Sequence, residues 1–232
     1  MINDNGTIVA LDFTSRRDAE ALVARLGNAC SHYKIGLELL TAAGPALVED
    51  LVGRGHEVFL DLKLFEIPNS VAGAVRAAGA LGASMVTVHA MGGTGIIAAA
   101  VDAAREFPGL RVLALTVVTS MTGSDLADIG MGGGTTTDEQ VLRLARLAVG
   151  AGCDGVIASP REAGALRGVL GPRPLIVTPG VTLPGGSAGE HGSRAATSQA
   201  AFAAGASHVV VGRSVTRAAD PVAALRRVRA GG

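Results

Sequence analysis

Aromatic side chains are nearly absent from this sequence of 232 residues, which has no tryptophan, one tyrosine and five phenylalanines. A hydrophobic core must therefore come from alanine, valine, leucine and glycine, which suits close packing of helices on a sheet. Cysteine is also scarce. Cys30 and Cys153 lack the spacing of metal ligands, so we expect buried packing residues in a reducing cytoplasm.

The sequence also lacks a surplus of charge, since 20 basic residues balance 20 acidic ones. Proteins that bind nucleic acid normally carry a basic surplus, so none is expected as a partner. No apolar run reaches the 18 residues of a membrane span, and the N-terminal segment MINDNGTIVALDF does not have the pattern of a signal peptide. These absences predict a cytoplasmic protein that binds neither nucleic acid nor membrane.

Short β-branched runs alternate along the whole chain with stretches of helical period. The predicted strands are Thr7–Phe13, Ser31–Leu37, Glu57–Leu62, Met85–His89, Arg111–Val117, Gly155–Ala158, Leu175–Thr178 and Ser207–Gly212. The predicted helices are 15–26, 38–54, 69–81, 94–106, 138–151, 160–170, 197–204 and 215–229. Gly55, Gly82, Gly152 and Gly205 follow helices as left-handed caps would.

Eight such units predict an α/β protein with a single (β/α)₈ barrel domain over residues 1–232. A doubly wound open sheet is the alternative, but the first strand is followed by Asp12-Phe13-Thr14-Ser15 instead of a glycine-rich dinucleotide fingerprint. The long segments 119–137 and 179–196 both follow strands. They are expected on the barrel face that carries active sites.

Three ionisable residues, Asp61, Lys63 and Glu66, crowd the end of the third predicted strand. Alternation places Phe59, Asp61 and Lys63 on one face of that strand. Charged groups on a face that should be core are costly unless they are paired. A structural salt bridge would explain the Asp-x-Lys spacing alone, so the spacing needs support from other strands.

That support comes from charged residues at neighbouring strands. Asp12 ends the first strand, Lys34 lies in the second and His89 ends the fourth, so a closed barrel would bring them to one mouth. Alternating ammonium and carboxylate groups would keep each other ionised without a metal. An isolated lysine could instead reach solvent, and His89 could be a hydrogen-bonded structural group.

The turn Val211-Gly212-Arg213-Ser214 joins the last strand to the last helix. Barrel enzymes commonly bind phosphate in the loops after strands 7 and 8, so Gly212 and Arg213 are candidate phosphate ligands. An ordinary capped turn with a surface arginine is the alternative.

With these motifs the chain resembles the orotidine 5′-phosphate decarboxylase family over nearly its whole length. The matching stretches are Val9-Ala10-Leu11-Asp12, Tyr33-Lys34-Ile35-Gly36, Phe59-Leu60-Asp61-Leu62-Lys63, Ile67-Pro68-Asn69, Val88-His89-Ala90, Thr116-Val117-Val118-Thr119-Ser120-Met121, Val177-Thr178-Pro179-Gly180-Val181 and Val210-Val211-Gly212-Arg213. The resemblance implies a homodimeric barrel that needs no cofactor or metal. It implies the decarboxylation of orotidine 5′-monophosphate in UMP biosynthesis.

The resemblance implies a charged tetrad of Lys34, Asp61, Lys63 and Glu66. It also implies that the fourth member reaches into the neighbouring subunit's site. Lys63 would protonate the C6 carbanion, and Asp61 would crowd the departing carboxylate. The residues implied to bind substrate are Asp12, Ser70, Thr119, Ser159, Thr182, His191, Gly212 and Arg213.

The chain departs from the family pattern at the tetrad and at the phosphate loop. The family's fourth acid is aspartate where this chain has Glu66, and its usual threonine is Ser70. Thr182 stands where similar bacterial members carry arginine, and His191 stands in place of a glutamine further along the same loop. Two alternatives therefore stay open, namely a paralogous decarboxylase of a different pyrimidine acid and a non-catalytic nucleotide-binding protein.

Overall fold

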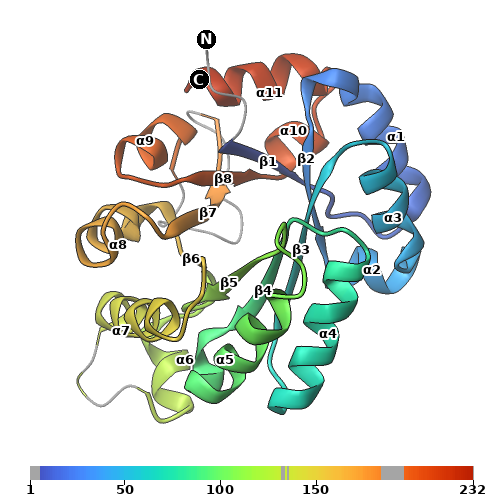
Figure 1. Ribbon diagram of the computed structural model, residues 1–232. Coiled ribbons are helices and arrows are strands. Elements are labelled where there is room, and N and C mark those ends of the chain that lie inside the picture. The colour runs from blue at the N-terminus through green and yellow to red at the C-terminus, as the bar shows by residue number, and fades with distance from the viewer. Residues whose placement is uncertain (1–5, 132–133, 135, 184–195, 232) are drawn as a thin grey trace.

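The computed structural model describes residues 6–131, 134, 136–183 and 196–231. Eight parallel strands form a closed barrel in sequence order (Figure 1). The strands are β1 (Thr7–Ala10), β2 (His32–Gly36), β3 (Glu57–Leu64), β4 (Met85–His89), β5 (Arg111–Leu115), β6 (Gly155–Ile157), β7 (Leu175–Val181) and β8 (His208–Val211). The last strand pairs with the first through the register Ile8↔Val210, so the predicted (β/α)₈ barrel is confirmed and the open sheet is wrong.

Helices connect the strands on the outside of the barrel. They are α1 (Arg16–Leu26), α2 (Leu37–Ala43), α3 (Ala46–Gly53), α4 (Pro68–Ala80), α5 (Gly93–Ala104), α6 (Gly123–Asp128), α7 (Thr137–Gly150), α8 (Ala163–Leu170), α9 (Ser198–Ala203), α10 (Arg213–Thr216) and α11 (Pro221–Ala230). Three short 3₁₀ turns are Gly27–Ala29, Ala90–Gly92 and Pro160–Glu162.

Two helices predicted as continuous are each broken in two. The segment 38–54 divides into α2 and α3 because Gly44, at a left-handed φ of 72°, ends the first helix and Pro45 precedes the second. The segment 215–229 divides into α10 and α11, where the Asp220 side chain caps the N-terminus of α11 by accepting from Ala223 N. The predicted left-handed glycines Gly55, Gly82, Gly152 and Gly205 all have positive φ.

Alternation along the strands divides the buried side chains into two layers. One layer lies between the barrel and its helices and includes Tyr33, Ile35 and Leu60. The other fills the barrel itself and consists of Ile8, Ala10, Phe59, Met85, Leu113, Leu115, Ile157, Val177 and Val210. A filled interior means that any ligand must bind at an end of the barrel.

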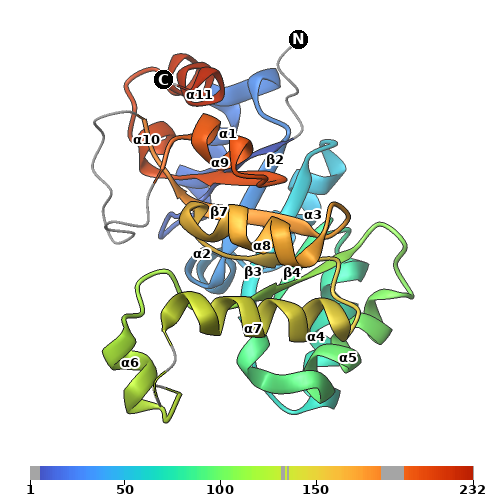
Figure 2. The same ribbon diagram turned by 90° about the vertical axis from the view of Figure 1, so that its left-hand side faces the viewer.

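The C-terminal ends of the strands form the mouth of the barrel, where α2, α6 and α10 lie on one side of the molecule (Figure 2). The predicted long segment 119–137 contains α6, whose first turn is capped by Thr122. Among the described residues, no helix has both the length and the apolar character needed to span a bilayer.

Candidate active site

Four charged side chains form an alternating row at the mouth of the barrel. Lys34 Nζ lies 2.9 Å from Asp12 Oδ1 and 3.6 Å from Asp61 Oδ2, and Lys63 Nζ lies 2.8 Å from Asp61 Oδ1. Lys34 and Lys63 are the two lysines of the whole sequence. The convergence expected from the strand ends is therefore present, and both side-chain amines of the protein lie in this charged row.

The row holds its central carboxylate in the charged form. Burial alone would raise the pKa of Asp61, but the Lys34 and Lys63 ammonium groups and a hydrogen bond from Thr87 outweigh it, so the pKa lies below its ordinary value. The side chain of Asp61 is 15% exposed and that of Lys34 is 11% exposed, whereas that of Lys63 is 36% exposed. Lys63 is thus the more accessible of the two cations.

Strand geometry explains why these side chains meet. Ile8, Ala10 and Asp12 alternate toward the inside along the first strand, and Phe59 and Asp61 do so along the third. Gly36 ends β2 beside the Lys34 ammonium. A Cβ atom at this position would lie 3.3 Å from Lys34 Nζ, so the lack of a side chain at Gly36 leaves room for the ammonium group.

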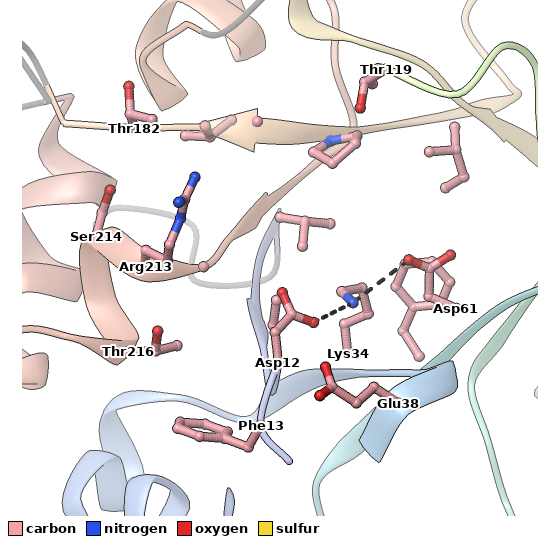
Figure 3. A pocket seen from close by; sticks show the side chains of 18 of the residues that line it. Asp12, Phe13, Lys34, Glu38, Asp61, Thr119, Thr182, Arg213, Ser214 and Thr216 are labelled. Atoms are coloured by element: carbon pink, nitrogen blue, oxygen red, sulfur yellow. Dashed lines mark hydrogen bonds and ion pairs between the residues drawn. The ribbon is translucent and has the colours of Figure 1, made fainter. Parts of the chain in front are cut away.

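A cavity of about 720 Å³ opens beside the charged row. Its floor is apolar and includes Phe59, Leu115, Ile157 and Val210, the top layer of the barrel interior. Figure 3 shows Asp61 at one end of the cavity and Arg213 with Thr182 at the other, with Lys34 and Asp12 between them. The cavity therefore offers a charged end, an apolar floor and a cationic end.

The cationic end is built by the turn after β8. Arg213, Ser214, Thr216 and Arg217 all line the cavity there, together with Gly212. Their helix, α10, has four residues, so the side chains rather than a long helix supply the polar groups at this end. Thr119 and Thr182 line the cavity from the loops after β5 and β7.

Glu66 and Ser70 do not join the charged row within a single chain. Both are exposed, and a hydrogen bond from the Ser70 side chain, helped by Ile67 N–H, lowers the pKa of Glu66. Two large apolar side chains flank Glu66, with Phe65 60% exposed and Ile67 61% exposed. The predicted fourth member of the tetrad thus lies on an apolar outer surface.

Ser159, which is predicted to contact substrate, directly follows Ala158 at the end of the β6 segment, and its contact with substrate stays a prediction. Ser159 is 1% exposed, is not among the residues that line the cavity, and donates its backbone N–H to Glu162 Oε2 at 2.7 Å. Its position is set by the 3₁₀ turn Pro160–Glu162, which it precedes. His191, the other predicted ligand on a long loop, lies outside the described residues.

His89 has a structural contact of the kind expected for a strand-end histidine. Its Nδ1 accepts a hydrogen bond from Met91 N at 3.2 Å, and its ring packs against Phe65 with 5.8 Å between centroids. Burial, with a smaller effect from the Lys63 charge, lowers the pKa of His89. Neutral His89 therefore caps the turn Ala90–Gly92.

Sequence reasoning missed Thr87, Glu38 and Arg217. Thr87 hydrogen-bonds to Asp61 and to the backbone of Lys63, yet in the sequence it looks like any threonine of a β-strand. Glu38 and Arg217 line the cavity from α2 and from the residue after α10. The spacing of Arg217 four residues after Arg213 was the one available signal, because i and i+4 share a helix face.

No group of three or more His, Cys, Asp or Glu side chains within the described ranges is arranged to hold a metal ion.

Comparison with known proteins gives matches over almost the full chain. The family model described as "Orotidine 5'-phosphate decarboxylase / HUMPS family" matches residues 7–228. A protein named orotidine 5′-phosphate decarboxylase from Halorhodospira halophila is 49% identical over 224 residues, which cover 96% of this chain and 94% of that protein. The protein of the same name from Anaeromyxobacter sp. (strain K) is 47% identical over 222 residues, covering 96% of each.

Solved structures agree with the sequence matches. The crystal structure of orotidine 5′-phosphate decarboxylase from Lactobacillus acidophilus has a TM-score of 0.86 and 34% identity, and the match covers 97% of this chain and 98% of that one. An uncharacterized conserved protein from Geobacillus kaustophilus has a TM-score of 0.82, also at 34% identity.

Proposed function

The chain belongs to the orotidine 5′-phosphate decarboxylase / HUMPS family, and from this membership we propose that it converts orotidine 5′-monophosphate to uridine 5′-monophosphate and CO₂. The observation that carries the proposal is the row Asp12–Lys34–Asp61–Lys63 beside a cavity with a cationic far end. In this proposal residues 1–232 form a single (β/α)₈ barrel domain.

The cavity accounts for the three parts of the substrate. The phosphate dianion binds at Arg213 and the Gly212 turn, where planar guanidinium groups suit phosphate oxygens. The ribose hydroxyl groups bind Asp12 and Lys34, which lie between the two ends. The pyrimidine ring lies on the apolar floor, where Thr119 lines the cavity, and Ser159 after β6 is its proposed polar contact.

The reaction uses no metal or organic cofactor in this proposal. The bond between C6 and the carboxylate breaks heterolytically, CO₂ leaves, and the electron pair stays on C6 as a carbanion. Lys63 then delivers a proton to C6, because its ammonium is the more exposed of the two and lines the cavity. The neutral amine regains a proton from water.

Differential binding explains how the row speeds the reaction. In the substrate the carboxylate lies beside the Asp61 carboxylate, and two like charges at close range repel. As CO₂ leaves, the negative charge moves to C6 and toward the Lys63 ammonium, which is 2.8 Å from Asp61. The site is therefore better suited to the transition state than to the ground state.

A second copy of the chain completes the site in this proposal. Glu66 lies on the outer surface between exposed Phe65 and Ile67, and Leu37 is also exposed at the start of α2. Burying this apolar surface in a homodimer would carry Glu66 and Ser70 toward the partner's charged row. Unpaired, buried Cys30 and Cys153 suit the cytoplasmic setting that we propose for the dimer.

The proposal is tested by following the absorbance of orotidine 5′-monophosphate with purified protein and no added metal. Turnover is expected, and Lys63→Ala is expected to abolish it while circular dichroism stays unchanged. Arg105→Ala is the matched control, because it removes an exposed cation that pairs with Asp102 on α5, away from the cavity. Full activity of Lys63→Ala would exclude Lys63 as the proton donor.

The departures at Glu66 and Thr182 favour a second candidate, a paralogue that decarboxylates a different pyrimidine acid. Thr182 lines the cationic end but carries no charge. Turnover of a dephosphorylated or otherwise altered analogue, with none of orotidine 5′-monophosphate, would support the paralogue. Tight binding without any turnover would support a nucleotide-binding protein instead.

A further inference from the structure

The strand that carries Asp61 and Lys63 is irregular where these residues lie. Leu60 is opposite Val86 and Leu64 is opposite Val88, so residues 61–63 of β3 face a single β4 residue, Thr87. At the end of this bulge Lys63 has a φ of 51°, and it is the one non-glycine residue within the described ranges with a positive φ. A left-handed conformation costs a residue with a side chain roughly 1–2 kcal/mol, so something must hold it.

Thr87 makes the contacts that would hold it. Its side chain is fully buried, its Oγ1 accepts a hydrogen bond from Lys63 N at 2.8 Å, and the same oxygen donates to Asp61 Oδ1 at 3.1 Å. A hydroxyl group has one proton to donate, and a backbone N–H can only donate, so this arrangement of the two bonds is the consistent one. Asp61 must accept, as an ionised carboxylate does.

We propose that Thr87 is a positioning residue for the decarboxylation, which keeps Lys63 in its left-handed conformation and orients Asp61 toward it. Met85 and Thr87 alternate along β4 on the inside of the barrel, which places the Thr87 hydroxyl directly beneath the charged row. One hydroxyl group thereby connects the backbone of the proposed proton donor to the carboxylate beside it.

Removing the hydroxyl has a defined physical consequence. Without an acceptor, the Lys63 N–H at the bulge loses its partner, and a buried unpaired donor is costly. The chain can lower that cost by returning Lys63 to an ordinary strand conformation. This would turn its Cα–Cβ bond and move the ammonium away from Asp61 and the cavity.

The kinetic test compares variants of Thr87 on orotidine 5′-monophosphate, and so this part rests on the proposed function. In Thr87→Val, which removes the hydroxyl but keeps the shape, kcat is expected to fall by roughly 10- to 100-fold. KM is expected to change less than about 3-fold, because Arg213 and Asp12 are untouched. Thr87→Ser keeps the hydroxyl and should restore kcat to within a few-fold of the wild type.

Thr116→Val is the matched control. Thr116 is equally buried directly after β5, and its Oγ1 donates to the Ile157 carbonyl at 3.0 Å, but it does not line the cavity. Loss of the Thr116 hydroxyl group is expected to lower the stability of the protein without lowering kcat. An equal fall in kcat in Thr116→Val and Thr87→Val would show a general effect of packing and would overturn the proposal.

A second measurement does not depend on activity. Since the sequence has two lysines, ¹⁵N-lysine labelling gives one backbone amide signal for Lys34 and one for Lys63. In Thr87→Val the Lys63 amide should shift and lose protection against hydrogen exchange, whereas the Lys34 amide should not. Thr116→Val should change neither signal.

The kinetic measurement and the amide measurement together separate the proposed function from the positioning role of Thr87. An inactive wild-type protein whose Lys63 amide still depends on the Thr87 hydroxyl would overturn the proposed function but not the positioning. Should Thr87→Val fail to fold, Thr87→Cys replaces it, because a thiol is a weaker donor and acceptor, and an intermediate fall in kcat is expected. Wild-type kcat and an unchanged Lys63 amide in either variant would overturn the positioning role.

Discussion

Two histidines at the N-terminal end of the barrel, His32 (buried) and His208 (partly buried), are expected to make the protein less stable as the pH falls below 6.5. His32 begins β2 and His208 begins β8, and their rings meet edge to face with 6.1 Å between centroids. His32 Nε2 and His208 Nδ1 are buried and have no hydrogen-bond partner in the described part of the chain. The charged groups that act on the pair are Arg111 and Glu57.

This environment favours the neutral rings. Burial and then the Arg111 charge lower the pKa of His32 from 6.5 to about 4. Burial, His32 and Arg111 lower the pKa of His208 to about 4 as well, against a smaller opposing effect of Glu57. Each shift is equivalent to roughly 3 kcal/mol at 1.36 kcal/mol per pH unit.

The direction of the effect follows from proton binding. Between about pH 4 and pH 6.5 the unfolded chain binds more protons than the folded one, so the free energy of unfolding rises with pH. The stabilisation is complete above pH 6.5 and is lost as the pH falls through this range. Each histidine should contribute up to about 1.4 kcal/mol per pH unit, a large share of a typical stability of 5–15 kcal/mol.

Urea unfolding followed by circular dichroism between pH 7.5 and pH 5 measures this slope. Carboxylates with lowered pKa, such as Asp61 and Glu139, have ordinary values of 3.8 and 4.5, so most of their effect falls below pH 5. His208→Gln should reduce the slope, and His32→Gln/His208→Gln should reduce it further and leave the part due to His56 and His89, whose pKa values burial also lowers. A free energy of unfolding that stays constant between pH 7 and pH 5 in the wild type would refute the reasoning.

The remaining predictions concern the mouth of the barrel. Glu66→Asp should raise kcat on orotidine 5′-monophosphate by up to ~10-fold, because one methylene displaces the carboxylate by about 1 Å; a lower kcat would indicate a site suited to another ligand. Thr182→Arg should lower KM by roughly 10-fold with kcat unchanged, since a charged hydrogen bond to phosphate contributes about 1.5–3 kcal/mol; an unchanged KM would place Thr182 away from the phosphate. Gly36→Ala should lower kcat/KM by roughly 10-fold at unchanged melting temperature, because its Cβ would press on Lys34 Nζ at 3.3 Å; wild-type kcat/KM would show that the ammonium can yield without loss.

Local pattern was sufficient to predict the barrel and the charged row. Strand alternation placed Phe59 inside the barrel and Asp61 above it, and the ends of the first three strands predicted that Asp12, Lys34 and Asp61 would meet. These predictions succeeded because side-chain direction in a strand depends on period alone, and parallel strands of a barrel all end at one mouth.

Other features of the site depended on contacts between segments distant in sequence. The sequence shows that Ser159 follows a strand, but only the structure shows that it precedes the turn Pro160–Glu162 and is buried. Gly44-Pro45 marks the break between α2 and α3, but the apolar pattern on either side of it predicted one continuous helix. The hydrophobic period of a segment predicts which face of a helix or strand is buried, but it does not determine where a loop places its side chains.

The amino-acid sequence was enough to predict the number of βα units, the direction of side chains along the strands and the residues that could carry the charge. The left-handed backbone of Lys63, its hydrogen bond to Thr87 and the outward position of Glu66 could be seen only in the folded chain. These depend on a two-residue slip between β3 and β4 and on the surface that surrounds the mouth. Such features arise from hydrogen bonds between neighbouring strands, which no local pattern in either strand encodes.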